Sequence, residues 1–174
     1  MDAAFELFGE GGEAAVTVRS VCRVAELNSR YFYESFADTG ELLGAVYDDV
    51  VADLILALTT AMSDLPDDPA RLRAGIRAVL DFSSADPRRG KILFTEARTN
   101  PVLTARRAAT QEQLRESVLT DAPGGSEPDR VTALVSAAMY AGAMAELAQQ
   151  WLSGKLGEDL DAVVEAAALS LLPG

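Results

Sequence analysis

The chain has 174 residues, is 49% hydrophobic and 6% aromatic, and carries 15 Lys and Arg against 27 Asp and Glu, for a net charge of −12. This length suits one domain, or a small domain beside a larger one, with room for a hydrophobic core. Because the chain has no histidine and one cysteine, a His-based general base, a His-ligated zinc site and an internal disulfide are excluded. We expect no enzymatic activity, no metal and no cofactor.

The hydropathy pattern gives no sign of a membrane or secretory segment. No uninterrupted apolar run reaches the ~18 residues that a membrane-spanning helix needs. The first residues, MDAAFELF, lack the basic start of a signal peptide. Helical spacing of apolar residues recurs along the chain and no strand alternation is evident. We therefore expect an all-α protein in the cytoplasm.

The first two predicted helices are short and have clear ends. Apolar residues give the first helix one face, and glycines at positions 9, 11 and 12 end it. Thr17 can cap the second helix, because its hydroxyl accepts a hydrogen bond from a free backbone N–H of the first turn. That helix runs to about Val24, and Ala25–Asn28 is a break.

A third short helix follows the break and is rich in aromatic residues. Asn28 and Ser29 are both good N-caps for it. A short turn between two helices, with polar and aromatic groups on the second, is the helix-turn-helix pattern, whose second helix enters the DNA major groove. The alternative is a helical hairpin whose aromatic side chains fill a core.

The N-terminal segments resemble the tetracycline-repressor-like (TetR) family of transcriptional regulators. The resemblance covers about the first 47 residues, namely AAFELFGEGG (Ala3–Gly12), TVRSVCRVAEL (Thr17–Leu27) and NSRYFYESFADTGELLGAVY (Asn28–Tyr47). It implies a three-helix DNA-binding head over residues 1–44 and a C-terminal helical domain for effector binding and dimerisation over residues 45–174. The rest of the chain matches this family only in the number and length of its helices.

The helix-turn-helix interpretation assigns DNA contacts to a small set of residues. We expect these contacts from Thr17, Asn28, Ser29, Arg30, Tyr31, Tyr33 and Thr39. The four residues from Asn28 to Tyr31 lie where base edges are normally reached, so Arg30 could bind guanine or a phosphate, and Asn28 could bind adenine or only cap the helix. The resemblance implies that Tyr33 contacts a backbone phosphate, whereas Phe32 and Phe36 anchor the helix inward.

Three residues depart from the pattern of that family. Glu26 replaces the usual turn glycine, so we expect a strained turn. Tyr31 is bulkier than the common small polar residue. Thr39 stands where many members have a phosphate-binding lysine. The absence of this lysine contact would weaken affinity for DNA more than it would weaken discrimination between sequences.

Helices are also predicted for the remainder of the chain. A long helix runs from Asp38, with Glu41 completing a capping box, to about Leu65. Further helices are expected over residues 70–85, 86–98 and 102–119, separated by proline-containing breaks. Residues 121–128, DAPGGSEP, form the clearest loop.

The last two predicted helices, over residues 129–152 and 158–172, are rich in alanine and other small residues. Small residues let helix backbones approach closely, and helices that are apolar over most of their surface need a cover. The resemblance implies that both helices pair with their copies in a two-fold homodimer, whose recognition helices would lie ~34 Å apart on a near-palindromic operator. The alternative is an alanine-rich core of a monomer.

The resemblance also implies an effector cavity among the C-terminal helices. The candidate lining residues are Phe82, Phe94, Tyr140, Met144 and Trp151. Apolar and aromatic groups would suit a small hydrophobic effector, although each of these side chains could equally be ordinary core.

The charge distribution opposes DNA binding, because contacts to phosphate dominate affinity for DNA. Residues 1–44 hold three arginines and eight carboxylates, a net charge of −5, whereas Thr17–Phe36 alone has a net charge of +1. We therefore predict a DNA-binding regulator that acts as a homodimer, in the form of an effector-responsive repressor. The alternative is a helical dimer that binds a small molecule or a partner protein, with weak or lost DNA binding.

Overall fold

The structure is a computed structural model that describes residues 1–65, 68–96, 100–121 and 127–171. Every regular element in these ranges is a helix, as the sequence predicts. The elements are α1 (Asp2–Gly11), η1 (Glu13–Ala15), α2 (Val18–Val24), α3 (Ser29–Ser35), α4 (Thr39–Met62), α5 (Asp68–Ala85), α6 (Pro87–Gly90), η2 (Lys91–Thr95), α7 (Pro101–Asp121), α8 (Glu127–Leu152) and α9 (Leu160–Leu171).

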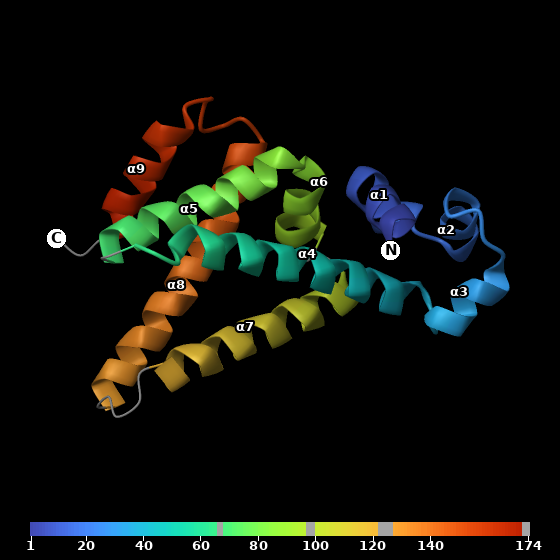
Figure 1. Ribbon diagram of the computed structural model, residues 1–174, viewed down its shortest axis with the longest axis horizontal. Coiled ribbons are helices and arrows are strands. Elements are labelled where there is room, and N and C mark those ends of the chain that lie inside the picture. Colours follow the sequence, from blue (N-terminus) through green and yellow to red (C-terminus); the bar gives the residue numbers. More distant parts are fainter. Residues whose placement is uncertain (66–67, 97–99, 122–126, 172–174) are drawn as a thin grey trace.

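The first three helices form a head at one end of an elongated molecule (Figure 1). Helix α4 leads out of this head and runs through the body, where it contacts α5 and α7. Helix α8 crosses behind and contacts α5 and α7, while α9 packs on α5. Helix α3, the predicted recognition helix, therefore lies at the tip of the molecule, and α8 and α9 lie toward the opposite end (Figure 1).

Two hydrophobic clusters hold these elements together. The first joins Phe8, Val16 and Phe32 of the head to residues of α4, α5, η2 and α7. The second packs α5, α8 and α9 against one another through buried side chains such as Ile76 and Val164. The predicted domain boundary after residue 44 falls inside α4 and inside the first cluster. The division into residues 1–44 and 45–174 therefore stays a prediction about function.

Side-chain caps fix the starts of the predicted head helices. The Thr17 hydroxyl accepts from the backbone N–H of Ser20 at 3.0 Å, and the Ser20 hydroxyl oxygen accepts in return from the backbone N–H of Thr17 at 2.9 Å. This reciprocal pair satisfies two backbone donors at the helix start. Asp38 accepts from the backbone N–H of Glu41 at 2.9 Å, and so confirms the predicted start of the long helix.

The predicted helix over residues 86–98 differs from the observed element. Asp86 caps α6, and Arg88 hydrogen bonds lower the pKa of the Asp86 carboxyl. After Gly90 the backbone continues in π-helical geometry over η2, which apolar spacing does not predict. Gly90 lies close to α8, since an ideal Cβ there would lie 2.3 Å from Leu152 Cδ1. Arg98 and residues 122–126 of the predicted loop lie outside the described residues.

Helix α8 departs from the expectation that no segment could span a membrane. Within the described residues, Arg130–Leu152 is long and apolar enough to do so by length and composition alone. Polar side chains such as Glu146 and Gln149 interrupt its apolar run, which is why a search for uninterrupted runs misses it. Because little of this helix is buried within one chain, its apolar surface requires another cover.

Candidate nucleic-acid interface and effector cavity

The turn between α2 and α3 has the geometry of a helix C-terminus that normally uses glycine. The backbone N–H of Leu27 donates to the Cys22 carbonyl at 2.9 Å, and Glu26 between them has φ of +54°. This bond closes a Schellman motif, whose left-handed residue is usually glycine because a Cβ is disfavoured there. Glu26 is the one non-glycine residue with positive φ among the described residues, so the strained turn expected from the sequence is confirmed.

Glu26→Gly is expected to stabilise the protein, because glycine adopts this left-handed conformation without a Cβ penalty. Part of the gain is offset by the larger entropy of glycine in the unfolded chain. We expect a net increase of about 0.5–1 kcal/mol, or about 1–4 °C in Tm by calorimetry for a chain of this size. Glu26→Ala keeps the Cβ and serves as the control. An equal rise in both variants would mean that lost charge, and not backbone strain, is responsible.

Recognition helix α3 is anchored by its phenylalanines and presents its other side chains to solvent. Asn28 accepts from the backbone N–H groups of Arg30 and Tyr31 at 2.9 and 3.4 Å, so its carboxamide oxygen is used as the cap. Phe32 is buried, and Phe36 is half-buried against the same cluster. Tyr31 and Tyr33 are 53% and 61% exposed. The outward face of α3 is therefore polar and aromatic.

The other predicted contact residues occupy the starts of helices. Ser29 is exposed at the first position of α3, and Thr17 is exposed at the N-cap of α2. Thr39 is half-buried at the first position of α4. The structure thus brings Asn28 to Tyr33 together on α3 and places Thr17 and Thr39 on neighbouring elements. Their roles in DNA binding stay predictions.

Two exposed side chains on this surface were not among the predicted DNA contacts. Leu27 is 51% exposed in the turn. Glu34 forms an ion pair with Arg30, with Nε and Oε1 2.8 Å apart. The four-residue separation of Arg30 and Glu34 is the spacing at which helical side chains meet, so this signal was present in the sequence.

Contacts between α1 and α6 connect the head to the body. Lys91 Nζ donates to the carbonyl oxygen of Glu10 at 3.0 Å, near the end of α1. The Arg88 guanidinium lies over the Phe5 ring, 5.0 Å from its centroid. Gly9 permits this approach, because an ideal Cβ at Gly9 would lie 2.4 Å from Arg88 Cβ.

A second connection runs between α4 and α7. Arg106 forms an ion pair with Asp48. Tyr47 is buried beside them and hydrogen bonds to Thr110, and its burial raises the pKa of the Tyr47 hydroxyl. Gly44 accommodates the Arg106 side chain, since an ideal Cβ there would lie 3.0 Å from Arg106 Nε. These contacts join α7 to the half of α4 that carries the head.

A cavity of about 300 Å³ lies between α7 and α8. Its lining consists of Ala108, Gln111, Glu112, Leu134, Ala137, Ala138 and Ala141. The wall is therefore mostly small apolar side chains with two polar groups at one side. This composition and volume suit a ligand with an apolar portion and few polar atoms.

The five pocket residues predicted from the sequence lie elsewhere in the core. Tyr140, Met144 and Trp151 belong to the cluster of α5, α8 and α9, Phe82 belongs to the other cluster, and Phe94 borders both. Burial raises the pKa of the Tyr140 hydroxyl. Tyr140 and Met144 follow the lining residues Ala137 and Ala141 by three positions, so they flank the cavity face of α8. Their role as ligand contacts stays a prediction.

Comparisons with known proteins agree with the arrangement of head and body. Residues 1–46 match the family described as bacterial regulatory proteins, tetR family. The HTH-type transcriptional activator FasR of Mycolicibacterium smegmatis is 26% identical over 170 residues, which cover 94% of this chain and 75% of that protein.

Solved structures share the fold over nearly the whole chain. FadR from Bacillus subtilis, in complex with stearoyl-CoA, superposes with a TM-score of 0.78 at 17% identity and covers 99% of this chain and 96% of its own. The fatty acid degradation regulator FadR from Bacillus halodurans gives a TM-score of 0.77 at 17% identity with the same coverage. The chain therefore matches the tetR family of bacterial regulatory proteins over residues 1–46, and it shares the fold of these solved regulators over nearly its whole length.

Proposed function

We propose that this DNA-binding transcriptional regulator acts as a homodimer whose operator affinity changes when an apolar effector binds between α7 and α8. The observation that carries the proposal is the exposed polar and aromatic face of α3 at the tip of the molecule, with a ligand-sized cavity in the body. Because it would bind operator DNA, we propose that the protein is cytoplasmic. We propose that it represses transcription. Because the relative FasR is an activator, a transcription assay is the measurement that decides between repression and activation.

DNA binding is tested by fluorescence anisotropy with labelled duplex from the region upstream of the coding sequence. Binding at nanomolar protein should survive unrelated competitor DNA and weaken as salt rises, because cations are released from phosphates. A matched duplex of scrambled sequence is the control. Equal affinity for both duplexes would contradict specific operator recognition.

Tyr33→Ala is expected to weaken operator binding about tenfold, because the variant removes an exposed phenol proposed to bind a backbone phosphate. Tyr33 is 61% exposed, and its ring contacts Phe32 edge-on with centroids 5.3 Å apart. Tyr33→Phe preserves that ring contact and removes only the hydroxyl. Anisotropy titrations should therefore give both variants a similar loss. Full affinity in Tyr33→Phe would assign the effect to ring packing.

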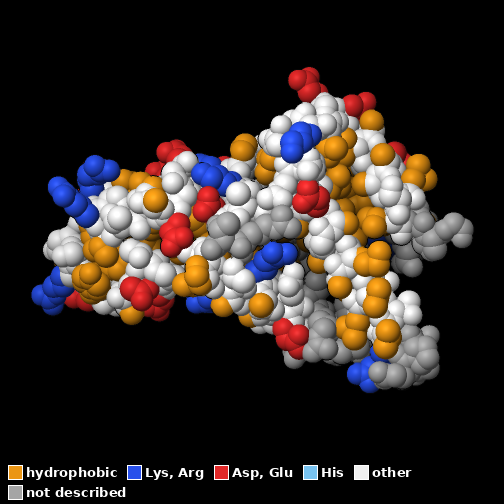
Figure 2. All heavy atoms as spheres, turned by 180° about the vertical axis from the view of Figure 1, so that it is seen from behind, with side chains coloured by type: hydrophobic (Ala, Val, Ile, Leu, Met, Phe, Trp, Pro, Cys, Tyr) orange, Lys and Arg blue, Asp and Glu red, His pale blue; other side chains and the backbone are white. Residues whose placement is uncertain are grey.

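The outer faces of α8 and α9 support a two-fold dimer. Val131, Val135 and Met139 are exposed at four-residue spacing on α8, and Leu169 of α9 is 67% exposed. Figure 2 shows hydrophobic side chains gathered over this end of the molecule, away from the head. A contiguous apolar surface of this kind marks an interface. We propose that the copies of α8 and α9 form a four-helix bundle and set two recognition helices ~34 Å apart.

The effector is proposed to be a long acyl compound. The groove between α7 and α8 has a wall of mostly small apolar side chains, which a hydrocarbon chain would contact. FadR from Bacillus subtilis, which has the same fold, was solved with stearoyl-CoA. Ligand binding would separate α7 from α8 and move α4 through the Arg106–Asp48 pair. DNA affinity would then change by the effector's differential affinity for the two arrangements.

Ala108→Trp is expected to weaken the effector response at least tenfold, because the indole fills the cavity that Ala108 lines. Operator affinity without effector is measured in the same variant, since an indole that itself separates α7 from α8 would lower it as bound effector does. Release of labelled operator DNA is measured while stearoyl-CoA is added. Ala109→Trp is the matched control, because Ala109 neighbours Ala108 on α7 and does not line the cavity. An unchanged response in Ala108→Trp would place the effector site elsewhere.

The net charge of −5 over residues 1–44 favours a second candidate function. In this alternative the protein is a helical dimer that binds a small molecule or a partner protein, with weak or lost DNA binding. Anisotropy separates the two functions. A folded dimer that binds stearoyl-CoA but no upstream duplex would support the alternative.

A further inference from the structure

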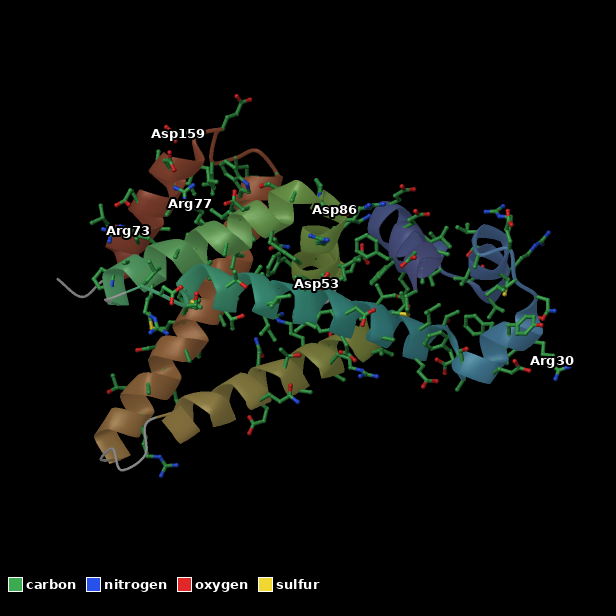
Figure 3. The ribbon with its side chains drawn as sticks, in the orientation of Figure 1. Arg30, Asp53, Arg73, Arg77, Asp86 and Asp159 are labelled. Atoms are coloured by element: carbon green, nitrogen blue, oxygen red, sulfur yellow. The ribbon has the colours of Figure 1, made fainter. Side chains whose placement is uncertain are left out.

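The recognition helix carries an ion pair whose geometry bears on base reading. Arg30 Nε lies 2.8 Å from Glu34 Oε1 on the next turn of α3. Their side chains are 83% and 51% exposed, so neither belongs to the core. Arg30 lies at the outer tip of the head and points away from the body (Figure 3). The pair therefore occupies the surface that would enter a major groove.

The bond to Glu34 determines which donors of Arg30 face outward. A guanidinium has five N–H donors in a rigid plane, one on Nε and four on the two terminal nitrogens. Glu34 uses the Nε donor. The edge formed by Nη1 and Nη2 then carries two parallel N–H bonds, which match the spacing of the O6 and N7 acceptors of guanine.

We propose that Glu34 is a positioning residue that holds Arg30 so that its terminal edge reads a guanine in the major groove. This inference rests on the proposed DNA-binding function. Glu34 restricts the rotation of a long side chain before binding, which lowers the entropy lost on complex formation. Exclusion of water from the groove strengthens the charge-assisted bonds of the pair.

The charge of the pair explains why Glu34 belongs on this face although DNA is anionic. Arg30 and Glu34 together are neutral, so the pair gains little from phosphates in general. A lone arginine at this position would bind phosphates of any sequence. Glu34 therefore lowers non-specific affinity for DNA and raises discrimination at one base pair. Asn28 caps the helix with its carboxamide oxygen, which accepts from two backbone N–H groups, so only its amide N–H donors are left to meet a base.

The experiment is selection from a randomised duplex library, followed by titration of single-base variants of the selected site. The full chain is compared with Arg30→Ala, Glu34→Gln and Glu13→Gln. Glu13 is exposed in η1, outside the helix-turn-helix, so Glu13→Gln is the control for loss of one negative charge in the head. Circular dichroism checks that each variant is folded.

The wild-type chain should select guanine at one position of each half-site, and Arg30→Ala should lose this preference and so identify the position. Glu34→Gln should reduce discrimination at that same base pair about tenfold while binding random duplex more tightly. Glu13→Gln should bind random duplex somewhat more tightly and retain full discrimination.

Three outcomes would overturn the inference. If Glu34→Gln keeps its discrimination and only binds all duplexes more tightly, Glu34 acts only by repelling phosphates and does not position Arg30. A change confined to a neighbouring base pair would mean that Glu34 itself binds a base, such as the cytosine amino group. A wild-type chain that selects no sequence would remove the proposed DNA-binding function together with this inference.

Discussion

Gly9→Ala is expected to lower the thermal unfolding midpoint by about 2–12 °C. An ideal Cβ at Gly9 would lie 2.4 Å from Arg88 Cβ and 2.8 Å from Arg88 Cγ, so α1 and α6 must separate. Overpacking of this kind costs about 1–3 kcal/mol, and each kcal/mol shifts the midpoint of a chain of this length by about 2–4 °C. The separation would also disturb the Lys91–Glu10 hydrogen bond and the Arg88–Phe5 contact.

Gly142→Ala is the matched control for this variant. Gly142 lies inside α8, and nothing lies within 4 Å of an ideal Cβ there. Alanine is favoured over glycine inside a helix by about 1 kcal/mol, so this variant should be at least as stable as the wild type. Differential scanning calorimetry of the two variants separates packing from helix propensity. A similar midpoint for Gly9→Ala and wild type would contradict the tight contact between α1 and α6.

The head could be predicted from the sequence because its signals are local. Thr17 and Asp38 start their helices by accepting backbone hydrogen bonds three residues ahead. Glu26 occupies the position of the turn that adopts the left-handed conformation, and its φ is accordingly +54°. Each of these features depends on residues close together in the chain, where capping and turn chemistry apply directly.

Features that depend on distant segments could not be predicted in the same way. The close approach of Gly9 to Arg88 requires α1 to lie on α6, and neither helix encodes that contact alone. The π-helical geometry of η2 has no counterpart in apolar spacing. The α7–α8 cavity is lined by alanines such as Ala108 and Ala137, whereas sequence analysis favoured aromatic residues. The space left between two helices depends on how closely their backbones pack, which composition does not specify.

Met139→Glu is expected to raise the dimer dissociation constant more than 100-fold. Met139 is 65% exposed on the apolar stripe of α8 that begins at Val131 and Val135. If this stripe is the proposed interface, two-fold symmetry places the new carboxylate in it twice. An unpaired buried charge costs several kcal/mol, and every 1.4 kcal/mol is a tenfold change in affinity. Sedimentation equilibrium over a range of protein concentrations measures the change.

Leu56→Glu is the matched control, because Leu56 is 66% exposed on α4 and lies outside the proposed interface. The Leu56→Glu variant should remain dimeric with an unchanged thermal unfolding midpoint. Met139→Glu should be a monomer by sedimentation equilibrium and folded by circular dichroism. The monomer should bind a full operator no more tightly than a single half-site, because the second head is no longer held at high effective concentration. A dimeric Met139→Glu would move the interface to another face. A monomer with full operator affinity would mean that one head suffices for recognition.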